Sequence, residues 1–204
     1  MVVEEIDLYQ LRPENISPYL PGDDCGKCGT RTCSQLAKEI LQGKAKATSC
    51  PSISKFLAET IDAVAEIKMN LPESDPMLLK TGAGLIELNS PGPDAPVFVT
   101  ADSIVTVDVL KRIFSRTKVS AFMAPVETQG YTLDNAVTER TFTPMVVMKA
   151  LMDSGVSSKS QTRKIIIPGL ASGMEKNIER ATRWSVEVGP VSGFELPIFI
   201  ASRK

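Results

Sequence analysis

Residues 97–126 read VFVTADSIVTVDVLKRIFSRTKVSAFMAPV, which is an apolar run, an amphipathic stretch and a second apolar run. The two runs, residues 97–100 and 119–126, are short and rich in β-branched and aromatic residues, so each predicts a strand. Four apolar residues between them recur at the spacing of one helix face: Val107, Leu110, Ile113 and Phe114. The stretch therefore predicts a strand–helix–strand unit whose two strands are parallel.

The same alternation continues toward the C-terminal end. Thr143 followed by Pro144 is typical of a helix start, with a capping hydroxyl and a proline at the first helical position. Residues 165–167 and 184–188 are two further strand candidates, each followed by proline and glycine. Strands that alternate with helices indicate an α/β domain with a mainly parallel sheet over residues 96–204.

Four loops of this domain are expected to converge, because ligands of parallel sheets lie beyond the carboxyl ends of the strands. They are residues 100–103, 128–130, 168–173 and 189–193, and all are rich in small or hydroxyl-bearing residues. Glycine and proline are ordinary turn residues, so each loop alone indicates little. Four such loops at one edge of a sheet favour a large polar ligand.

The composition is that of an ordinary globular protein. The chain has 204 residues, of which 43% are hydrophobic and 23% charged, and its net charge is −1. This charge gives no electrostatic reason to expect nucleic acid or an anionic membrane as a partner. Aromatic residues make up only 5%, with one tryptophan, which disfavours a base-stacking platform.

Histidine is absent from the chain, which excludes every histidine nucleophile, histidine general base and histidine-ligated metal site. No run approaches the roughly 18 apolar residues that a membrane-spanning helix needs. The N-terminal residues 1–7 show neither a basic segment nor an apolar core of a signal peptide. We therefore expect a cytoplasmic protein.

The four cysteines form the most specific motif, C-x2-C-x4-C-x16-C, at Cys25, Cys28, Cys33 and Cys50. Gly26 and Gly29 lie in the first part of the motif, where glycine permits sharp turns that aim backbone N–H groups at inorganic sulfur. Pro51 follows the fourth cysteine, as in iron–sulfur proteins. Structural zinc usually uses two C-x2-C pairs, and disulfides are rare in the cytoplasm. The motif favours one 4Fe–4S cluster on these four thiolates over zinc or a disulfide.

These patterns divide the chain into three segments. Residues 1–62 are expected to form a small helical domain that holds the cluster, in which Thr32 caps a helix from Cys33 to Gly43. Residues 63–95 are rich in proline and glycine and predict a linker, although the apolar residues 78–79 and 85–88 can pack or form a short hairpin. Residues 96–204 complete the chain as the α/β domain.

Residues 20–51 resemble the cluster domain of the large subunit of the corrinoid iron–sulfur proteins of acetyl-CoA synthesis. Five segments of the second half are similar, in order and spacing, to the corrinoid-binding domain of that family: residues 96–100, 128–130, 142–144, 165–169 and 188–190. The family carries a TIM barrel between these two parts, for which residues 60–96 are too short. The resemblance thus implies a shortened form without that barrel.

The resemblance implies a Rossmann-like corrinoid-binding domain and a cobalamin-type cofactor bound base-off, since no histidine can replace the nucleotide base at cobalt. Residues 133–140 correspond to the short helix that covers the corrinoid, and here that segment is more polar. The residues expected to contact the corrinoid lie in the four loops and this helix: Thr100, Ala101, Asp102, Ser103, Thr106, Thr128, Gly130, Tyr131, Leu133, Asn135, Ala136, Gly169, Leu170, Ala171, Ser172, Gly189 and Pro190.

The implied function is that of a methyl carrier whose cluster reductively activates cobalt from Co(II) to Co(I). No catalytic acid–base group is expected, so the chain is one component of a corrinoid-dependent methyltransferase system. Its implied partners are a methyltransferase with a TIM-barrel domain and a reductive activator or ferredoxin. Two alternatives stay open: an iron–sulfur electron-transfer protein whose α/β domain is a docking module, and an accessory protein that only holds the corrinoid.

Overall fold

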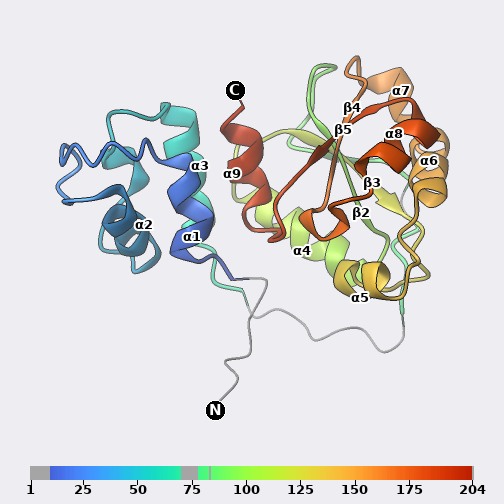
Figure 1. Cartoon of the computed structure of the whole chain (residues 1–204), viewed down its shortest axis with the longest axis horizontal. Coiled ribbons are helices and arrows are strands. Elements are labelled where there is room, and N and C mark those ends of the chain that lie inside the picture. The colour runs from blue at the N-terminus through green and yellow to red at the C-terminus, as the bar shows by residue number, and fades with distance from the viewer. Residues whose placement is uncertain (1–9, 70–77, 83, 204) are drawn as a thin grey trace, which may run out of the picture. The chain divides into compact units, whose positions relative to one another are not determined.

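The computed structural model describes residues 10–69, 78–82 and 84–203, which form two units (Figure 1). Of these residues, the first unit contains 10–69 together with 191–203, and the second contains 78–190. The sequence alone predicts that the C-terminal segment belongs to the second domain. The structure differs there because the last helix makes its contacts with a helix of the first unit.

The first unit is helical and small. Its elements are α1 (Pro13–Ile16), η1 (Ser17–Tyr19), α2 (Cys33–Leu41), η2 (Ala47–Ser49), α3 (Lys55–Ala65) and α9 (Leu196–Ala201). Ile16, Leu36 and Ile61 are fully buried and form the centre of its apolar core. Helix α9 packs against α3, and its preceding residue Glu195 accepts hydrogen bonds from Asn15 Nδ2 and from the Tyr19 hydroxyl, each at 2.7 Å.

Helix α2 begins and ends as the sequence predicts. The Thr32 hydroxyl oxygen accepts a hydrogen bond from the Gln35 N–H at 3.0 Å, so it caps one of the free N–H groups of the first turn. Gly43 follows the helix with a φ of +68°, a left-handed conformation in which a Cβ atom would be unfavourable. The residue chemistry at both ends therefore fixes where Cys33 lies, at the first position of the helix.

The second unit contains a five-stranded sheet in the order β1-β3-β2-β4-β5. Its strands are β1 (Ile86–Leu88), β2 (Val97–Ala101), β3 (Ala121–Val126), β4 (Lys164–Ile167) and β5 (Ser185–Val188). Strands β2 to β5 pair in parallel, which confirms the predicted α/β class and mainly parallel sheet. β1 pairs antiparallel with β3 at the sheet edge, so the apolar residues 85–88 of the expected linker do pack.

Helices cover both faces of this sheet (Figure 1). They are α4 (Ile104–Ser115), α5 (Leu133–Thr138), α6 (Pro144–Asp153), α7 (Val156–Lys159) and α8 (Glu175–Thr182), with the short turn η3 (Gly169–Ala171). On one face the ring of Phe98 from β2 stacks on Phe114 from α4, with 5.5 Å between ring centroids. On the other face Val97 and Ile165 share a buried cluster with residues of α5, α6 and α8.

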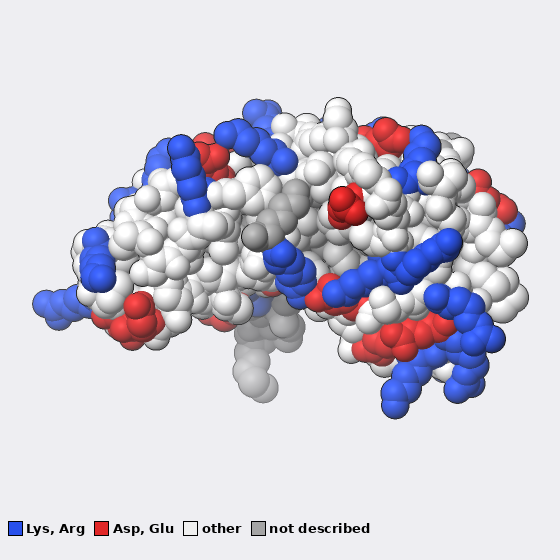
Figure 2. Space-filling view, turned by 90° about the horizontal axis from the view of Figure 1, so that it is seen from above, with Lys and Arg blue, Asp and Glu red and all other residues white. Residues whose placement is uncertain are grey.

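The strand order determines where a ligand fits. From β2 the chain passes through α4 to β3 on one side, and β4 then pairs with β2 on its other side. The order of the strand connections thus reverses between the parallel neighbours β2 and β4, and such switch points open a crevice at the carboxyl ends of the strands. In the described part of the chain, every helix is too short or too polar to span a bilayer. On the face shown in Figure 2, charges of both signs are mixed.

Candidate functional site

The four cysteines all lie in the first unit. Cys25 and Cys28 belong to the segment 21–32, which contains neither helix nor strand, whereas Cys33 starts α2 and Cys50 follows η2. Cys25 is exposed, Cys28 and Cys33 are half-buried, and Cys50 is buried. All four are free cysteines in this structure.

The cysteine segment turns sharply where the sequence predicts it. Gly26 and Gly29 have φ values of +70° and +90°, and Asp24 adopts +47°. From this strained position the Asp24 carboxylate accepts a hydrogen bond from the Cys33 N–H at 2.7 Å, which ties the start of the segment to the first turn of α2. A carboxylate is favourable there because the N-terminus of a helix carries partial positive charge.

Cys28 is the cysteine with a perturbed acidity. Its Sγ lies 3.2 Å from the Thr30 hydroxyl, and this side-chain hydrogen bond is the main cause that lowers the pKa of the Cys28 thiol below its usual range. The thiolate is the form that binds metal and iron–sulfur clusters. The environment of Cys28 thus favours the form that a ligand must take.

The η2 turn, which precedes Cys50, is held by a carboxylate from α3 that sequence analysis did not single out. Asp62 Oδ1 accepts a hydrogen bond from the Ala47 N–H at 2.5 Å, and its Oδ2 accepts from the Thr48 hydroxyl at 2.9 Å and from the Thr48 N–H at 3.2 Å. The Cys50 N–H in turn donates to the Ala47 carbonyl at 2.9 Å. Asp62 therefore fixes the η2 turn that presents Cys50, and only the tertiary contact between α3 and η2 reveals it.

The donor chemistry fits an iron–sulfur cluster, since four unpaired thiols lie in one small unit. Their geometry, however, is not that of an assembled site: in the part of the chain that the structure describes, no three Cys, Asp or Glu side chains converge closely enough to hold a metal ion. A bound cluster would have to draw the thiols together. The segment 21–32 has no ladder of backbone hydrogen bonds that would oppose this movement.

The residues expected to contact a corrinoid lie in the second unit, at the carboxyl ends of its parallel strands. Thr100 and Ala101 end β2, Asp102 and Ser103 connect it to α4, and Thr106 lies in the first turn of that helix. The others follow β3 (Thr128, Gly130, Tyr131, and Leu133, Asn135 and Ala136 on α5), β4 (Gly169, Leu170, Ala171 and Ser172) and β5 (Gly189 and Pro190). The structure therefore places them along one edge of the sheet, which we call the ligand edge.

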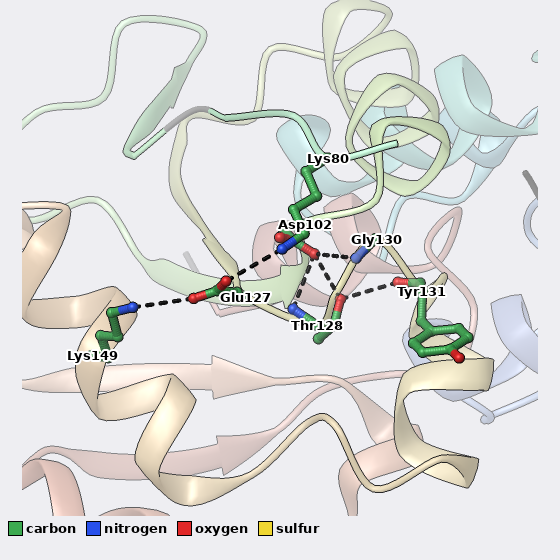
Figure 3. A network of polar contacts seen from close by, with 7 residues as sticks. All are labelled: Lys80, Asp102, Glu127, Thr128, Gly130, Tyr131 and Lys149. Atoms are coloured by element: carbon green, nitrogen blue, oxygen red, sulfur yellow. Dashed lines mark hydrogen bonds and ion pairs between the residues drawn. The ribbon is translucent and has the colours of Figure 1, made fainter. Parts of the chain in front are cut away.

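Three of these residues, Asp102, Thr128 and Gly130, are joined to one another by hydrogen bonds. Asp102 Oδ1 accepts hydrogen bonds from the Thr128 hydroxyl at 2.8 Å, the Thr128 N–H at 3.0 Å and the Gly130 N–H at 3.2 Å (Figure 3). Asp102 is 8% exposed and Thr128 is fully buried. The carboxylate thus joins the turn after β3 to the segment that follows β2, and it fixes the backbone of this part of the ligand edge.

The loops after β4 and β5 are also joined. The Gly169 N–H donates to the Pro190 carbonyl at 3.0 Å, and the Gly189 N–H donates to the Ile167 carbonyl at 2.8 Å. Helix α5 packs on η3, where Ala136 and Ala171 share the buried core cluster. The structure therefore brings the predicted residues of α5 next to those that follow β4.

Sequence analysis missed a segment that lies on the ligand edge. Residues 78–81, here called the edge strap, run antiparallel to the β2–α4 connection: the Thr81 N–H donates to the Asp102 carbonyl at 2.8 Å, and the Ile104 N–H donates to the Leu79 carbonyl at 2.9 Å. The only signal in the sequence is the apolar pair 78–79 within the proline- and glycine-rich region. Without the fold, nothing indicates which surface that pair contacts.

One charged cluster fixes the edge strap at its side. Lys80 on the strap lies 3.3 Å from the Glu127 carboxylate at the end of β3, and Lys149 of α6 lies 3.1 Å from the other oxygen of that carboxylate (Figure 3). Lys149 and then Lys80 hold the pKa of Glu127 below its usual range. Both ion pairs are largely exposed, so each contributes little to stability.

Comparison with known proteins gives matches on both units. Residues 59–200 match the family described as CO dehydrogenase/acetyl-CoA synthase delta subunit, and residues 20–52 match a family described as a putative Fe-S cluster. The chain is 31% identical to the gamma subunit of the acetyl-CoA decarbonylase/synthase complex of Archaeoglobus fulgidus over 53% of its length, and 26% identical to that of Methanopyrus kandleri over 57%. It is 24% identical over 78% of its length to the corrinoid/iron-sulfur protein large subunit of Moorella thermoacetica.

These relatives are longer proteins. The matched region spans 23% of the Archaeoglobus protein, 25% of the Methanopyrus protein and 36% of the Moorella protein. The match to the Moorella protein confirms the resemblance that residues 20–51 and the five later segments indicate. The family match over residues 20–52 includes all four cysteines at which an iron–sulfur cluster is expected.

Proposed function

The chain belongs to the CO dehydrogenase/acetyl-CoA synthase delta subunit family, and we propose that it is a corrinoid iron–sulfur protein that carries a methyl group. The observation that carries this proposal is the presence, in one chain, of a four-cysteine helical unit and an α/β unit whose loops gather at a switch point. The four cysteines lie within residues 20–52, which match the putative Fe-S cluster family, and 78% of the chain aligns with the corrinoid/iron-sulfur protein large subunit. The first unit, residues 10–69 with 191–203, is proposed to hold the cluster, and the second unit, residues 78–190, is proposed to hold the corrinoid.

In the first unit, Cys25, Cys28, Cys33 and Cys50 would hold a 4Fe–4S cluster, which supplies single electrons when bound. Asp24 and Asp62 keep the backbone on both sides of the cysteine segment in place through their hydrogen bonds to the Cys33 N–H and to the η2 turn. Thr30 favours the thiolate of Cys28. These contacts position the cysteine ligands and favour the thiolate form of Cys28. The proposed role of the cluster's electrons is the reductive activation of Co(II) to Co(I).

In the second unit, the ligand edge would hold a cobalamin-type corrinoid, whose cobalt carries the methyl group. The absence of histidine supports a base-off form, because no imidazole can take the place of the nucleotide base. Ser103 and Ser172 offer hydroxyls, while Gly169 and Gly189 allow a close approach of the backbone. Helix α5 is the proposed cover of the corrinoid, and its side chains Leu133 and Asn135 are half-buried there.

The chain is proposed to act with partners in the cytoplasm. Among the residues expected to contact the corrinoid, Asp102 has the single carboxylate, and it is buried and accepts three hydrogen bonds, which leaves it poorly placed to act as a general acid or base. A methyltransferase with a TIM-barrel domain would therefore complete each methyl transfer, and a reductive activator or ferredoxin would deliver electrons. Several relatives are subunits of the acetyl-CoA decarbonylase/synthase complex, which supports a multi-protein setting.

The proposal is tested on the full chain purified without oxygen and then incubated with hydroxocobalamin. About four iron and four sulfide per chain, together with cobalamin that co-elutes on gel filtration, is the expected result. Iron and sulfide without retained cobalamin would favour the electron-transfer alternative. Zinc without sulfide would contradict the cluster assignment.

A further inference from the structure

The edge strap covers the part of the ligand edge where β2 meets α4. The Leu79 carbonyl accepts the N–H of Ile104, the first residue of a twelve-residue helix, and so occupies the place at which a helix N-terminus binds an anionic oxygen. The Leu78 carbonyl packs directly on Gly130: a Cβ atom at Gly130 would lie 1.9 Å from that oxygen. While the strap is in place, a ligand therefore cannot reach the Ile104 N–H, or approach Gly130 from the side on which Leu78 packs.

The hydroxyl group of Ser103, which lies opposite Lys80 of the strap, has no hydrogen-bond partner in the part of the chain that the structure describes. Its side chain is fully buried, and its Oγ is the single buried side-chain oxygen or nitrogen without a hydrogen-bond partner among the residues that the structure describes. It stands at the N-cap of α4 but makes no cap hydrogen bond. Buried hydroxyls are almost always paired, so Ser103 Oγ is a group to which a ligand oxygen could supply a hydrogen-bond partner.

The side chains of the strap are only partly buried. Leu78 and Leu79 are 37% and 47% exposed, so little apolar surface anchors them. The ion pair of Lys80 with Glu127 joins two side chains that are each about half exposed, and such pairs are weak. Two backbone hydrogen bonds, to the Asp102 carbonyl and from the Ile104 N–H, also hold the strap. A segment held in this way opens at a small cost in free energy.

We propose that the edge strap is a displaceable cover of the ligand edge, which closes the site in the free protein and leaves when a corrinoid binds. On displacement, the Ile104 N–H exchanges the Leu79 carbonyl for an oxygen of the ligand, and Ser103 Oγ gains a partner. The helix N-terminus favours an anionic oxygen, such as the phosphodiester of the nucleotide tail. The inference rests on the proposed corrinoid site and adds the step that controls access to it.

Amide hydrogen exchange of the full chain tests the cover, with hydroxocobalamin as the probe. The Thr81 N–H loses its acceptor when the strap leaves, so its exchange should become at least about tenfold faster when cobalamin is bound, because opening becomes the main state. Bound cobalamin with unchanged Thr81 exchange would overturn the proposal. Cobalamin that binds neither the natural chain nor the variants below would instead refute the proposed function.

Two lysine variants test the strap without any ligand. Lys80→Ala and Lys149→Ala each remove one cation from Glu127, but only Lys80 belongs to the strap. Lys80→Ala should speed Thr81 exchange severalfold, while Lys149→Ala should leave it near the natural rate. Equal rates of Thr81 exchange in the two variants would show that the strap does not open as a unit. This result would refute the proposed cover whether or not cobalamin binds.

Discussion

Gly130→Ala is the substitution that most directly perturbs the strap. The new Cβ atom would lie 1.9 Å from the Leu78 carbonyl oxygen and 2.4 Å from the Leu78 carbonyl carbon, so the strap has to move away. Gly130 also has a φ of +83°, and alanine in that region costs about 1–2 kcal/mol. Loss of the two strap hydrogen bonds adds about 1–3 kcal/mol, at about 0.5–1.5 kcal/mol each. The expected total is roughly 2–5 kcal/mol of unfolding free energy.

Gly173→Ala is the matched control, since Gly173 has a φ of +93° and no atom within 4 Å of the place where a Cβ atom would lie. It carries the backbone strain without the clash, so its expected cost is only about 1–2 kcal/mol. Urea unfolding followed by tryptophan fluorescence measures both, because Trp184 is the single tryptophan of the chain and is buried in the second unit. Equal losses of stability in the two variants would refute the reasoning that the strap packs on Gly130.

Two further predictions concern the first unit. Asp62→Ala removes the acceptor of three hydrogen bonds at the turn that presents Cys50, so a chelator should extract iron about 10- to 100-fold faster. The control variant Glu66→Gln breaks only the exposed ion pair with Lys46 and should not change that rate. Equal rates of iron extraction in the two variants would disprove a positioning role for Asp62. Burial first, and then the hydrogen bond to the Glu195 carboxylate, raise the pKa of Tyr19. Its stabilising effect should therefore be complete below about pH 10, the usual tyrosine pKa, and be lost as the pH rises above it. Circular dichroism melts should show this loss in the natural chain and not in Tyr19→Phe, and a loss in both would contradict the assignment.

Much of the α/β unit could be predicted from local pattern. The strands around residues 97–126 and the helix capped by Thr143 follow from apolar periodicity and cap chemistry, and they appear as β2, β3, α4 and α6. The Thr143 hydroxyl indeed accepts a hydrogen bond from the Val146 N–H. Such features depend on neighbours in sequence, so a single sequence contains them.

The remaining features depend on contacts between distant residues. Asp102 is a loop carboxylate in the sequence, and its bonds to Thr128 and Gly130 arise only when β2 and β3 lie side by side. The strap residues 78–81 and the packing of α9 on α3 are of the same kind. The cysteine motif indicates the chemistry of the cluster ligands, but the positions of the thiols depend on the fold and on the cluster itself.

The most direct test of the central claim is electron paramagnetic resonance of the full chain, loaded with iron, sulfide and cobalamin without oxygen. Partial reduction should give the Co(II) signal of a protein-bound, base-off corrinoid without strong nitrogen splitting, because the chain contains no histidine. Full reduction should convert this signal to a silent cobalt state and show a reduced 4Fe–4S cluster in the same sample. A Co(II) signal with strong nitrogen superhyperfine splitting, or a cluster signal without any protein-bound cobalt, would contradict the account.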